Sequence, residues 1–196
     1  TTVLHGAGVD VQAYSYQAYP ENACVHFLYL GRIMKEKGMD ELLDACEQLH
    51  QEGYSFVLDL VGFFEDAYKQ RINQLSAQGI VVFHGFQQEP RPFYAACDCV
   101  VLPSYHEGMS NVLLEAAATG RPVITSDIPG CREAVVDQKS GLLVPKGDAQ
   151  ALYQAMKHML SIDRAQREQM GLAGRKWIKQ QFSKEQVVRE TKNALM

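Results

Sequence analysis

The feature that most limits how this chain can fold is a series of short, continuously apolar runs separated by amphipathic segments. The runs predict strands at 25–31, 55–62, 80–85, 99–104, 122–127 and 141–145. Segments with a helical pattern of apolar residues lie between them, at 39–50, 65–79, 91–97, 110–119 and 131–136. Strands that are apolar throughout are typical of a parallel sheet with both faces covered. The alternation therefore predicts a doubly wound, mostly parallel, Rossmann-like α/β sheet.

The two ends of the chain depart from this repeat. The opening residues, which include "HGAGVDVQAY", predict a leading strand and loop. After Gly147 the sequence is helical and charged, with Asp148 placed to cap one helix and Ser183 placed to cap the last. We therefore expect an α/β domain over residues 1–182 and a C-terminal helix over 183–196. Because the chain starts at Thr1 and not at Met, we also expect it to be part of a longer protein.

Composition and charge argue against several classes of protein. The net charge is −4 and the cations do not cluster, so no nucleic-acid-binding surface is expected. No apolar stretch approaches the roughly 18 residues that a membrane span needs, and no secretory signal peptide is recognisable. The five cysteines form no CxxC pair. We expect buried, reduced thiols in a cytoplasmic protein.

The loops that follow the strands carry the candidate binding residues, because ligands of an open parallel sheet bind beyond the carboxyl ends of its strands. These loops contain Gly31, Arg32 and Lys37 after the first strand, His84, Gly85 and Phe86 after the third, 104–111 after the fourth and 126–133 after the fifth. The helix that begins at Met109–Asn111 directs free N–H groups toward the same edge, which favours an anion. Gly108, just before it, allows a ligand to approach the backbone.

Two cations in the first loop complete this anion site. Arg32 offers a planar fork and Lys37 a point charge, a combination suited to a diphosphate. The alternative is that both are solvated loop residues with no ligand.

Two glutamates in the fourth loop and its helix need a further explanation. Glu115 lies in the second turn of a helix that enters the core, where an unpartnered carboxylate is costly. An ionised carboxylate accepts from two hydroxyls at once, so Glu115 is suited to a ribose and Glu107, beside the anion site, to a hexose. The alternatives are an exposed loop acid for Glu107 and a local capping or salt-bridge partner for Glu115.

Four segments resemble the donor-binding half of the retaining glycosyltransferases of family 4, which have the GT-B architecture. They are "GRIMKEKGMDELLDA", "VVFHGF", "CDCVVLPSYHEGMSNVLLEAAATGRPVITSDIPGCREAV" and "GLLVPKGDAQALYQAM". The most specific feature is the glycine–arginine…lysine–glycine loop followed by two glutamates with seven residues between them. The resemblance covers nearly the whole chain.

The resemblance implies a role for each matching residue. Arg32, Lys37 and Glu107 would be catalytic: the two cations hold the donor diphosphate, and Glu107 contacts the donor sugar. Glu115 would hold the ribose hydroxyls. The remaining donor-binding residues would be Gly31, Gly85, Phe86, His106, Gly108, Met109, Ser110, Asn111 and Val112, of which Met109–Val112 form the helix start and Gly85–Phe86 surround the base. His84 is expected to form part of a loop or of the base-pocket wall.

The implied activity is transfer of a sugar from a nucleotide diphosphate sugar, with retention and without a bound metal or other cofactor. A UDP- or GDP-sugar is expected more than an ADP-sugar, with a polysaccharide, glycolipid or small glycoside as acceptor, as in cell-surface polysaccharide biosynthesis. The family's acceptor-binding N-terminal domain has no counterpart here, and the helix over 183–196 is expected to pack on it. We expect a cytoplasmic protein, peripheral at the inner face of the membrane only through that absent half.

Other readings of the chain remain as alternatives. A nucleotide-binding module without transfer activity of its own fits the same residues. A phospho-acceptor receiver or flavodoxin-like domain is disfavoured because Gly31–Arg32, and no cluster of aspartates, follows the first strand. A dinucleotide oxidoreductase is disfavoured because "GAG" at 6–8 is followed by Val11 where a third glycine or alanine is needed.

Overall fold

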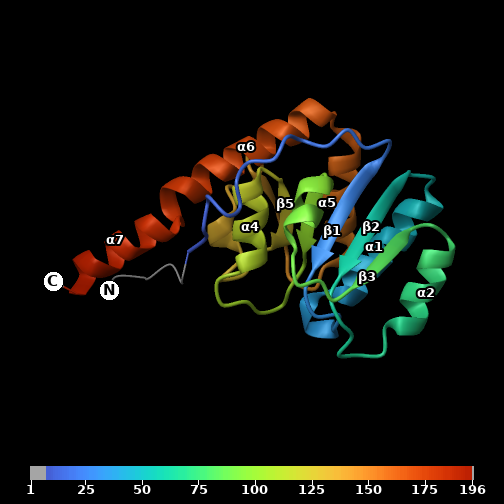
Figure 1. Ribbon diagram of the computed structural model, residues 1–196. Helices are drawn as coiled ribbons and strands as arrows, with labels where there is room; N and C mark the ends of the chain where they lie inside the picture. The colour runs from blue at the N-terminus through green and yellow to red at the C-terminus, as the bar shows by residue number, and fades with distance from the viewer. Residues whose placement is uncertain (1–7, 196) are drawn as a thin grey trace.

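Six strands form one parallel sheet in the order β3-β2-β1-β4-β5-β6 (Figure 1). The computed structural model describes residues 8–195. The strands are β1 Val25–Leu30, β2 Phe56–Val61, β3 Val81–Gly85, β4 Cys99–Leu102, β5 Val123–Ser126 and β6 Gly141–Val144. Each predicted strand is found within two residues of its expected ends. The Rossmann-like fold class is therefore confirmed.

Helices cover both faces of this sheet. They are η1 Lys35–Lys37, α1 Met39–Gln51, α2 Lys69–Ala77, α3 Arg91–Ala96, α4 Asn111–Thr119, η2 Arg132–Ala134, α5 Ala149–Ser161, α6 Arg164–Gln181 and α7 Lys184–Leu195. On one face α1 packs against α5, and on the other α4 packs against α3 and α6, as right-handed crossovers require when the strand order reverses. The reversal lies between β1 and β4, where a doubly wound sheet opens a crevice for a ligand.

The loops after β1, β2 and β3 are joined by backbone hydrogen bonds at this edge. The N–H of Gly31 donates to Val61 at 3.0 Å, and the N–H of Gly62 donates to Gly85 at 2.9 Å. A Cβ atom at Gly62 would lie 1.8 Å from the Gly31 carbonyl oxygen, so only glycine fits there. The three loops therefore form one continuous wall beside the crevice.

One predicted helix boundary was wrong, and one break between helices was not predicted. The helix expected from residue 65 begins at Lys69, because residues 62–68 form a loop whose Glu65 N–H donates to Ile33 at 3.1 Å. The C-terminal helical region also breaks between α5 and α6, where Asp163 and Gln166 form a reciprocal capping box.

The N-terminal segment makes a turn at residues 11–14, then continues without secondary structure over the helices, and does not form the expected leading strand. Val9 makes a single parallel bridge with Ser183, and no named strand precedes β1 within residues 8–24. Residues 5–7 of the predicted segment lie outside the described residues. The segment is held against α4 by a bond of 3.1 Å from the Gln17 N–H to the Thr119 carbonyl. It therefore belongs to the packing of the helices.

Arg121, just after α4, ties this segment to the rest of the domain. Its side chain is 0% exposed. It donates to five backbone carbonyls, those of Gln17, Ala18, Tyr94, Ala95 and Gly120, at 2.8–3.4 Å. The guanidinium is thus neutralised by peptide dipoles at the end of α3.

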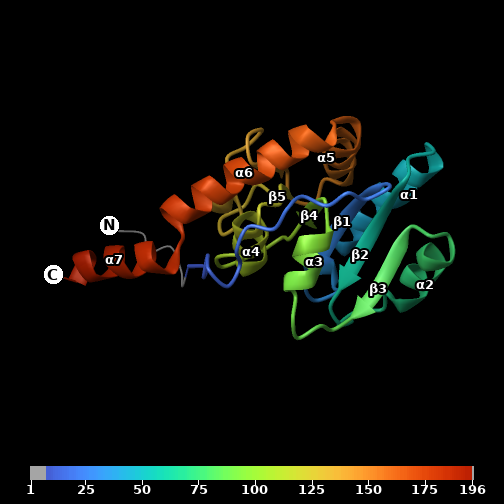
Figure 2. The same ribbon diagram turned by 45° about the horizontal axis from the view of Figure 1, so that its top comes forward.

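The last helix, α7, extends away from the sheet (Figures 1 and 2). Its first turn is attached through Val9, whose N–H donates to Phe182 at 2.8 Å and whose carbonyl accepts from Lys184 at 3.0 Å. Val187 is buried, whereas Val188 is 52% exposed. Packing of this helix on a further domain stays a prediction.

Candidate functional site

The loop between β4 and α4 holds Glu107 at the crevice. Lys37 Nζ lies 2.7 Å from Glu107 Oε1, and the Ser104 hydroxyl donates to the same oxygen at 2.7 Å. The Lys37 and Glu107 side chains are only 16% and 15% exposed. Glu107 is therefore not the exposed loop acid that the sequence left open, and Lys37 is not a freely solvated cation. An ammonium and a carboxylate meet at the point where the strand order reverses.

The loop after β5 packs directly beneath the Glu107 loop. The N–H of Ser110 donates to the Gly130 carbonyl at 2.9 Å, and the N–H of Gly130 donates to Glu133 Oε2 at 2.8 Å. A Cβ atom at Gly130 would lie 1.6 Å from the Gly108 carbonyl oxygen. Sequence analysis placed residues 126–133 at this edge but did not single out Gly130 or Glu133. The two loops are close-packed and hold Glu107 in place.

The N-terminus of α4 opens at the same edge. Ser110 is the N-cap, and its side chain makes no capping hydrogen bond. The first N–H groups of an α-helix have no intrahelical partner, so those of the first turn are available to an anion. Of the predicted residues here, Gly108 and Asn111 are exposed, and Met109 and Val112 are half-buried.

Arg32 lies on the other side of the crevice and has a partner that was not predicted. Its Nη1 contacts Glu65 Oε2 at 3.1 Å, and its side chain is 49% exposed. The Tyr29 hydroxyl donates to the Arg32 carbonyl at 2.5 Å. The structure thus holds the two predicted cations on two different carboxylates, Lys37 on Glu107 and Arg32 on Glu65. No sequence pattern indicated Glu65, because it lies in the loop that was predicted as helix.

Glu115 lies further along α4, half-buried, where its carboxylate receives hydroxyl groups. The Tyr94 hydroxyl donates to Glu115 Oε2 at 2.9 Å, and the Tyr14 hydroxyl lies near the same carboxylate. Burial raises the pKa of Glu115, and the Tyr94 and Tyr14 hydroxyls oppose that rise. Within the described residues Glu115 is neither a capping residue nor part of an ion pair. Both tyrosines read as ordinary core aromatics in the sequence and were not predicted.

Two further predicted residues, His84 and Phe86, lie at the end of β3, on the wall formed by the β1, β2 and β3 loops, whereas His106 lies in the loop between β4 and α4. Phe86 is 68% exposed, and its ring meets Phe63 edge to face with centroids 6.3 Å apart. His84 Nε2 lies 2.7 Å from Asp59 Oδ1, and its ring packs against Phe93. His106 is exposed beside Glu107.

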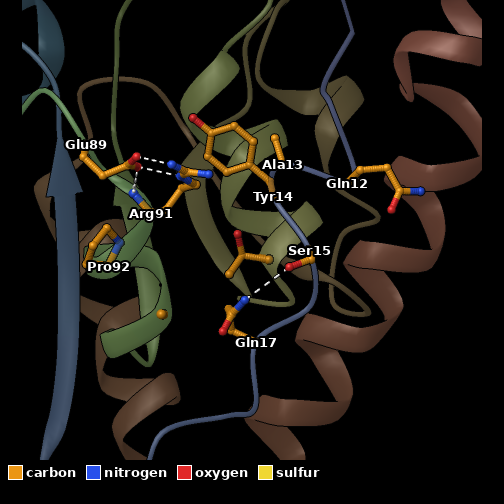
Figure 3. A pocket seen from close by; sticks show the side chains of 10 residues that line it. Gln12, Ala13, Tyr14, Ser15, Gln17, Glu89, Arg91 and Pro92 are labelled. Carbon is orange, nitrogen blue, oxygen red and sulfur yellow. Dashed lines mark hydrogen bonds and ion pairs between the residues drawn. The ribbon is translucent and has the colours of Figure 1, made fainter.

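A cavity of about 510 Å³ lies next to Tyr14 (Figure 3). It is lined by Gln12, Ala13, Tyr14, Ser15, Gln17, Glu89, Arg91, Pro92, Ala95 and Thr119. Arg91 Nε donates to Glu89 Oε1 at 2.7 Å at its rim. Lys37, Glu107 and Glu115 do not line it, so the cavity is separate from the crevice.

Comparison with known proteins identifies the family. The profile of the family described as "Glycosyl transferases group 1" matches residues 24–161. The chain belongs to this family. It is 32% identical over 160 residues to the capsular polysaccharide biosynthesis glycosyltransferase CapM of Staphylococcus aureus, an alignment that covers 79% of the chain and 41% of CapM. The chain spans less than half the length of the curated relatives it matches.

Solved glycosyltransferase structures have the same fold. Sucrose-phosphate synthase of Thermosynechococcus elongatus superposes with a TM-score of 0.81 at 27% identity, over 97% of this chain and 51% of that one. HepE of Anabaena, solved in complex with UDP, gives a TM-score of 0.82 at 22% identity, over 96% of this chain and 55% of that one. The sheet therefore matches the C-terminal domain of GT-B glycosyltransferases.

The described residues contain neither a membrane-spanning helix nor a cluster of metal-ligating side chains. No helix among residues 8–195 is both long and apolar enough to cross a bilayer. In the same part of the chain, no three or more His, Cys, Asp or Glu side chains are grouped as metal ligands.

Proposed function

We propose that this group 1 domain binds the nucleotide diphosphate sugar of a retaining, family 4 hexosyltransferase. The observation that carries the proposal is the Lys37–Glu107 pair, which lies half-buried at the carboxyl edge of the sheet beside the open N-terminus of α4. The Lys37 ammonium has three N–H donors. Within the described residues, its side-chain hydrogen bond goes to Glu107. The other N–H groups can therefore bind phosphate oxygens.

The proposed chemistry depends on charge at the departing diphosphate. When the bond between the anomeric carbon and the diphosphate breaks, negative charge grows on the leaving group. Lys37, Arg32 and the N–H groups of α4 supply compensating positive charge, an electrostatic form of catalysis. We propose that these groups serve in place of a metal ion. Arg32 contacts Glu65 through Nη1 and would bind the same anion with its other N–H donors or after exchanging this partner.

The two glutamates would hold the sugars on either side of the diphosphate. Glu107 would accept from hydroxyls of the transferred hexose and orient it. Glu115 would accept from the ribose hydroxyls. A uridine donor is favoured over other bases because HepE, which has the same fold, was solved with UDP and with UDP-glucose. The base would lie against Gly85 and Phe86.

The acceptor and location are proposed from the relatives. CapM and LpsE, from Rhizobium meliloti, are named for capsular polysaccharide and lipopolysaccharide core biosynthesis. We propose a polysaccharide or glycolipid acceptor, held by a further N-terminal domain against which α7 packs. The protein would be cytoplasmic and would meet the inner face of the membrane only through that domain.

Calorimetric titration with UDP, GDP and ADP tests the donor site. Lys37→Ala is expected to weaken UDP binding at least tenfold, or about 1.5 kcal/mol, because a charge-assisted contact is lost. The matched control is Lys157→Ala, which removes a lysine paired with Glu52 at 2.8 Å away from the crevice and leaves affinity unchanged. No binding of any of the three at millimolar concentration would refute the proposal.

A nucleotide-binding module without transfer activity is the second candidate for this chain taken alone. It is favoured because the chain covers less than half the length of these relatives, 41% of CapM and 46% of LpsE. UDP binding without release of UDP from UDP-glucose in the presence of oligosaccharide acceptors would support it. Turnover by the isolated chain would exclude it.

A further inference from the structure

The Glu115 carboxylate is held by two tyrosines from separate parts of the chain. Tyr94 comes from α3, and its hydroxyl donates to Glu115 Oε2 at 2.9 Å. Tyr14 comes from the N-terminal segment, and its hydroxyl lies near the same carboxylate and lowers the pKa of that acid. The two rings meet edge to face, with centroids 6.1 Å apart and planes at 72°, a favourable aromatic geometry. One hydroxyl therefore donates to this acid, and the ring that carries the second packs against the first.

Both tyrosines are fixed in position. Tyr94 is completely buried. The Tyr14 backbone N–H donates to Asp10 at 2.9 Å, and its carbonyl accepts from Arg175 Nη1 at 3.2 Å. Figure 3 shows the Tyr14 ring at the wall of the cavity beside the Glu89–Arg91 pair. A phenol has few rotatable bonds, so packing of the ring also fixes its hydroxyl.

The hydroxyls leave part of the carboxylate unused. An ionised carboxylate has about four lone-pair sites, and the Tyr94 hydroxyl occupies one of them. The remaining sites can accept from the vicinal hydroxyls of a ribose. A protonated carboxyl offers fewer acceptor sites and grips a diol less well.

The charged surroundings of this carboxylate are sparse. Burial opposes ionisation of Glu115, whereas the Tyr14 and Tyr94 hydroxyls favour it. Glu89 and Arg91 lie near Tyr14, where Glu89 raises and Arg91 lowers the pKa of the Tyr14 hydroxyl. The two tyrosines therefore act against the effect of burial on the pKa of this acid.

We propose that Tyr14 and Tyr94 are positioning residues that orient the Glu115 carboxylate for the ribose hydroxyls of the donor. The proposal rests on the ribose role of Glu115 in the proposed function and adds to it the groups that prepare that acid. Neither tyrosine needs to touch the nucleotide.

The test uses Tyr14→Phe and Tyr94→Phe, which remove one hydroxyl each and retain the ring. UDP and inorganic pyrophosphate are titrated into each variant between pH 5 and 8. At pH 7 each variant is expected to bind UDP about fivefold more weakly, the effect of one hydrogen bond, and pyrophosphate equally well. Loss of the hydroxyl also raises the Glu115 pKa further. As the pH is lowered, UDP binding should therefore weaken at a higher pH in the variants than in the unmodified protein.

Tyr16→Phe is the matched control. The Tyr16 hydroxyl donates to Glu168 Oε1 at 2.9 Å, away from α4's carboxylate. This variant should bind both ligands like the unmodified protein. Equal losses of UDP and pyrophosphate in Tyr14→Phe and Tyr94→Phe would overturn the positioning role, because they would point to a general structural effect.

A ligand-free measurement separates the two proposals. Titration of the Glu115 carboxyl by NMR should show a higher pKa in both Phe variants than in Tyr16→Phe, and an unchanged pKa would overturn the inference. If Glu115→Ala binds UDP normally, the ribose role in the proposed function fails. If Glu115→Ala weakens UDP binding and both Phe variants do not, the positioning role alone fails.

Discussion

Arg121 and Lys37 are both withdrawn from solvent, yet they serve opposite ends of the domain in different ways. Arg121 is enclosed after the last turn of α4, and its five bonds to carbonyls match the five N–H donors of a guanidinium. Lys37 lies at the carboxyl edge of the sheet, where its ammonium meets one carboxylate oxygen of Glu107. All the N–H donors of Arg121 are hydrogen-bonded within the chain, whereas Lys37 has N–H donors that can still bind a ligand.

The difference separates a structural charge from a binding charge. A buried cation with all its donors bonded has nothing to offer a ligand, and removing it leaves several carbonyls without a partner. A half-buried cation beside a helix N-terminus is only partly satisfied and can exchange partners. Burial alone does not mark a functional residue, whereas incomplete hydrogen bonding at a crevice does.

The largest expected effect is on stability, from Arg121→Met. The variant removes a strong donor from each of five carbonyls, and we expect a loss of about 3–5 kcal/mol in the free energy of unfolding, similar to breaking a buried ion pair. Urea denaturation measures it. Arg164→Met is the matched control, since Arg164 is exposed and bonds the carbonyls of Tyr19 and Pro20; it should lose about 1 kcal/mol or less. Equal effects of the two variants would remove the basis of the comparison.

A smaller effect, on binding only, is expected from Arg32. Arg32→Ala should weaken UDP binding by about 1.5 kcal/mol with no change in unfolding free energy, because the side chain is half exposed. Glu65→Gln sharpens the test: it frees Arg32 from its carboxylate and should tighten UDP binding. Weaker binding in Glu65→Gln would mean that Glu65 orients Arg32 and does not compete with the ligand. Titration calorimetry at constant salt measures both variants.

The smallest expected effect concerns Glu115 and pH. Burial raises its pKa in the folded state, so between the unfolded and folded values the native state holds more protons and stability falls as pH rises. Glu115→Gln removes this term. At pH 7 it should unfold at slightly higher urea, with a gain below about 1 kcal/mol because the group is partly solvated, and the gain should vanish below the ordinary glutamate pKa. A loss of stability at pH 7 would show that the carboxylate supports the fold.

The sequence predicted the sheet well because its central strands, such as β4 and β5, are buried on both faces. A short, continuously apolar run such as 99–104 is typical of a strand covered on both faces of a parallel sheet. β4 occupies Cys99–Leu102 within that run. The helix ends were less predictable. The start of α2 depends on bonds from the preceding loop to Ile33, which is distant in sequence. The break at Asp163 was readable, since Asp163 and Gln166 have the spacing of a capping box.

The candidate site was predicted in its residues but not in its contacts. The order of strands places Lys37 and Glu107 at one edge, and the structure pairs them. The partners Glu65, Tyr14 and Tyr94 come from a loop, an extended segment and a short helix whose folded positions no local pattern reveals. Arg121 was missed for the same reason: its carbonyl partners are brought together only by the tertiary fold.

The attachment of α7 has a mechanical consequence. Val9 is bonded to the chain on both sides of Ser183, and a single turn separates it from Tyr14. Any swing of this 12-residue helix about its base must either drag Val9 with it or rupture both of those bonds. Movement of α7 would therefore be transmitted to the segment that carries Tyr14, five residues from Val9, and through it to the surroundings of Glu115.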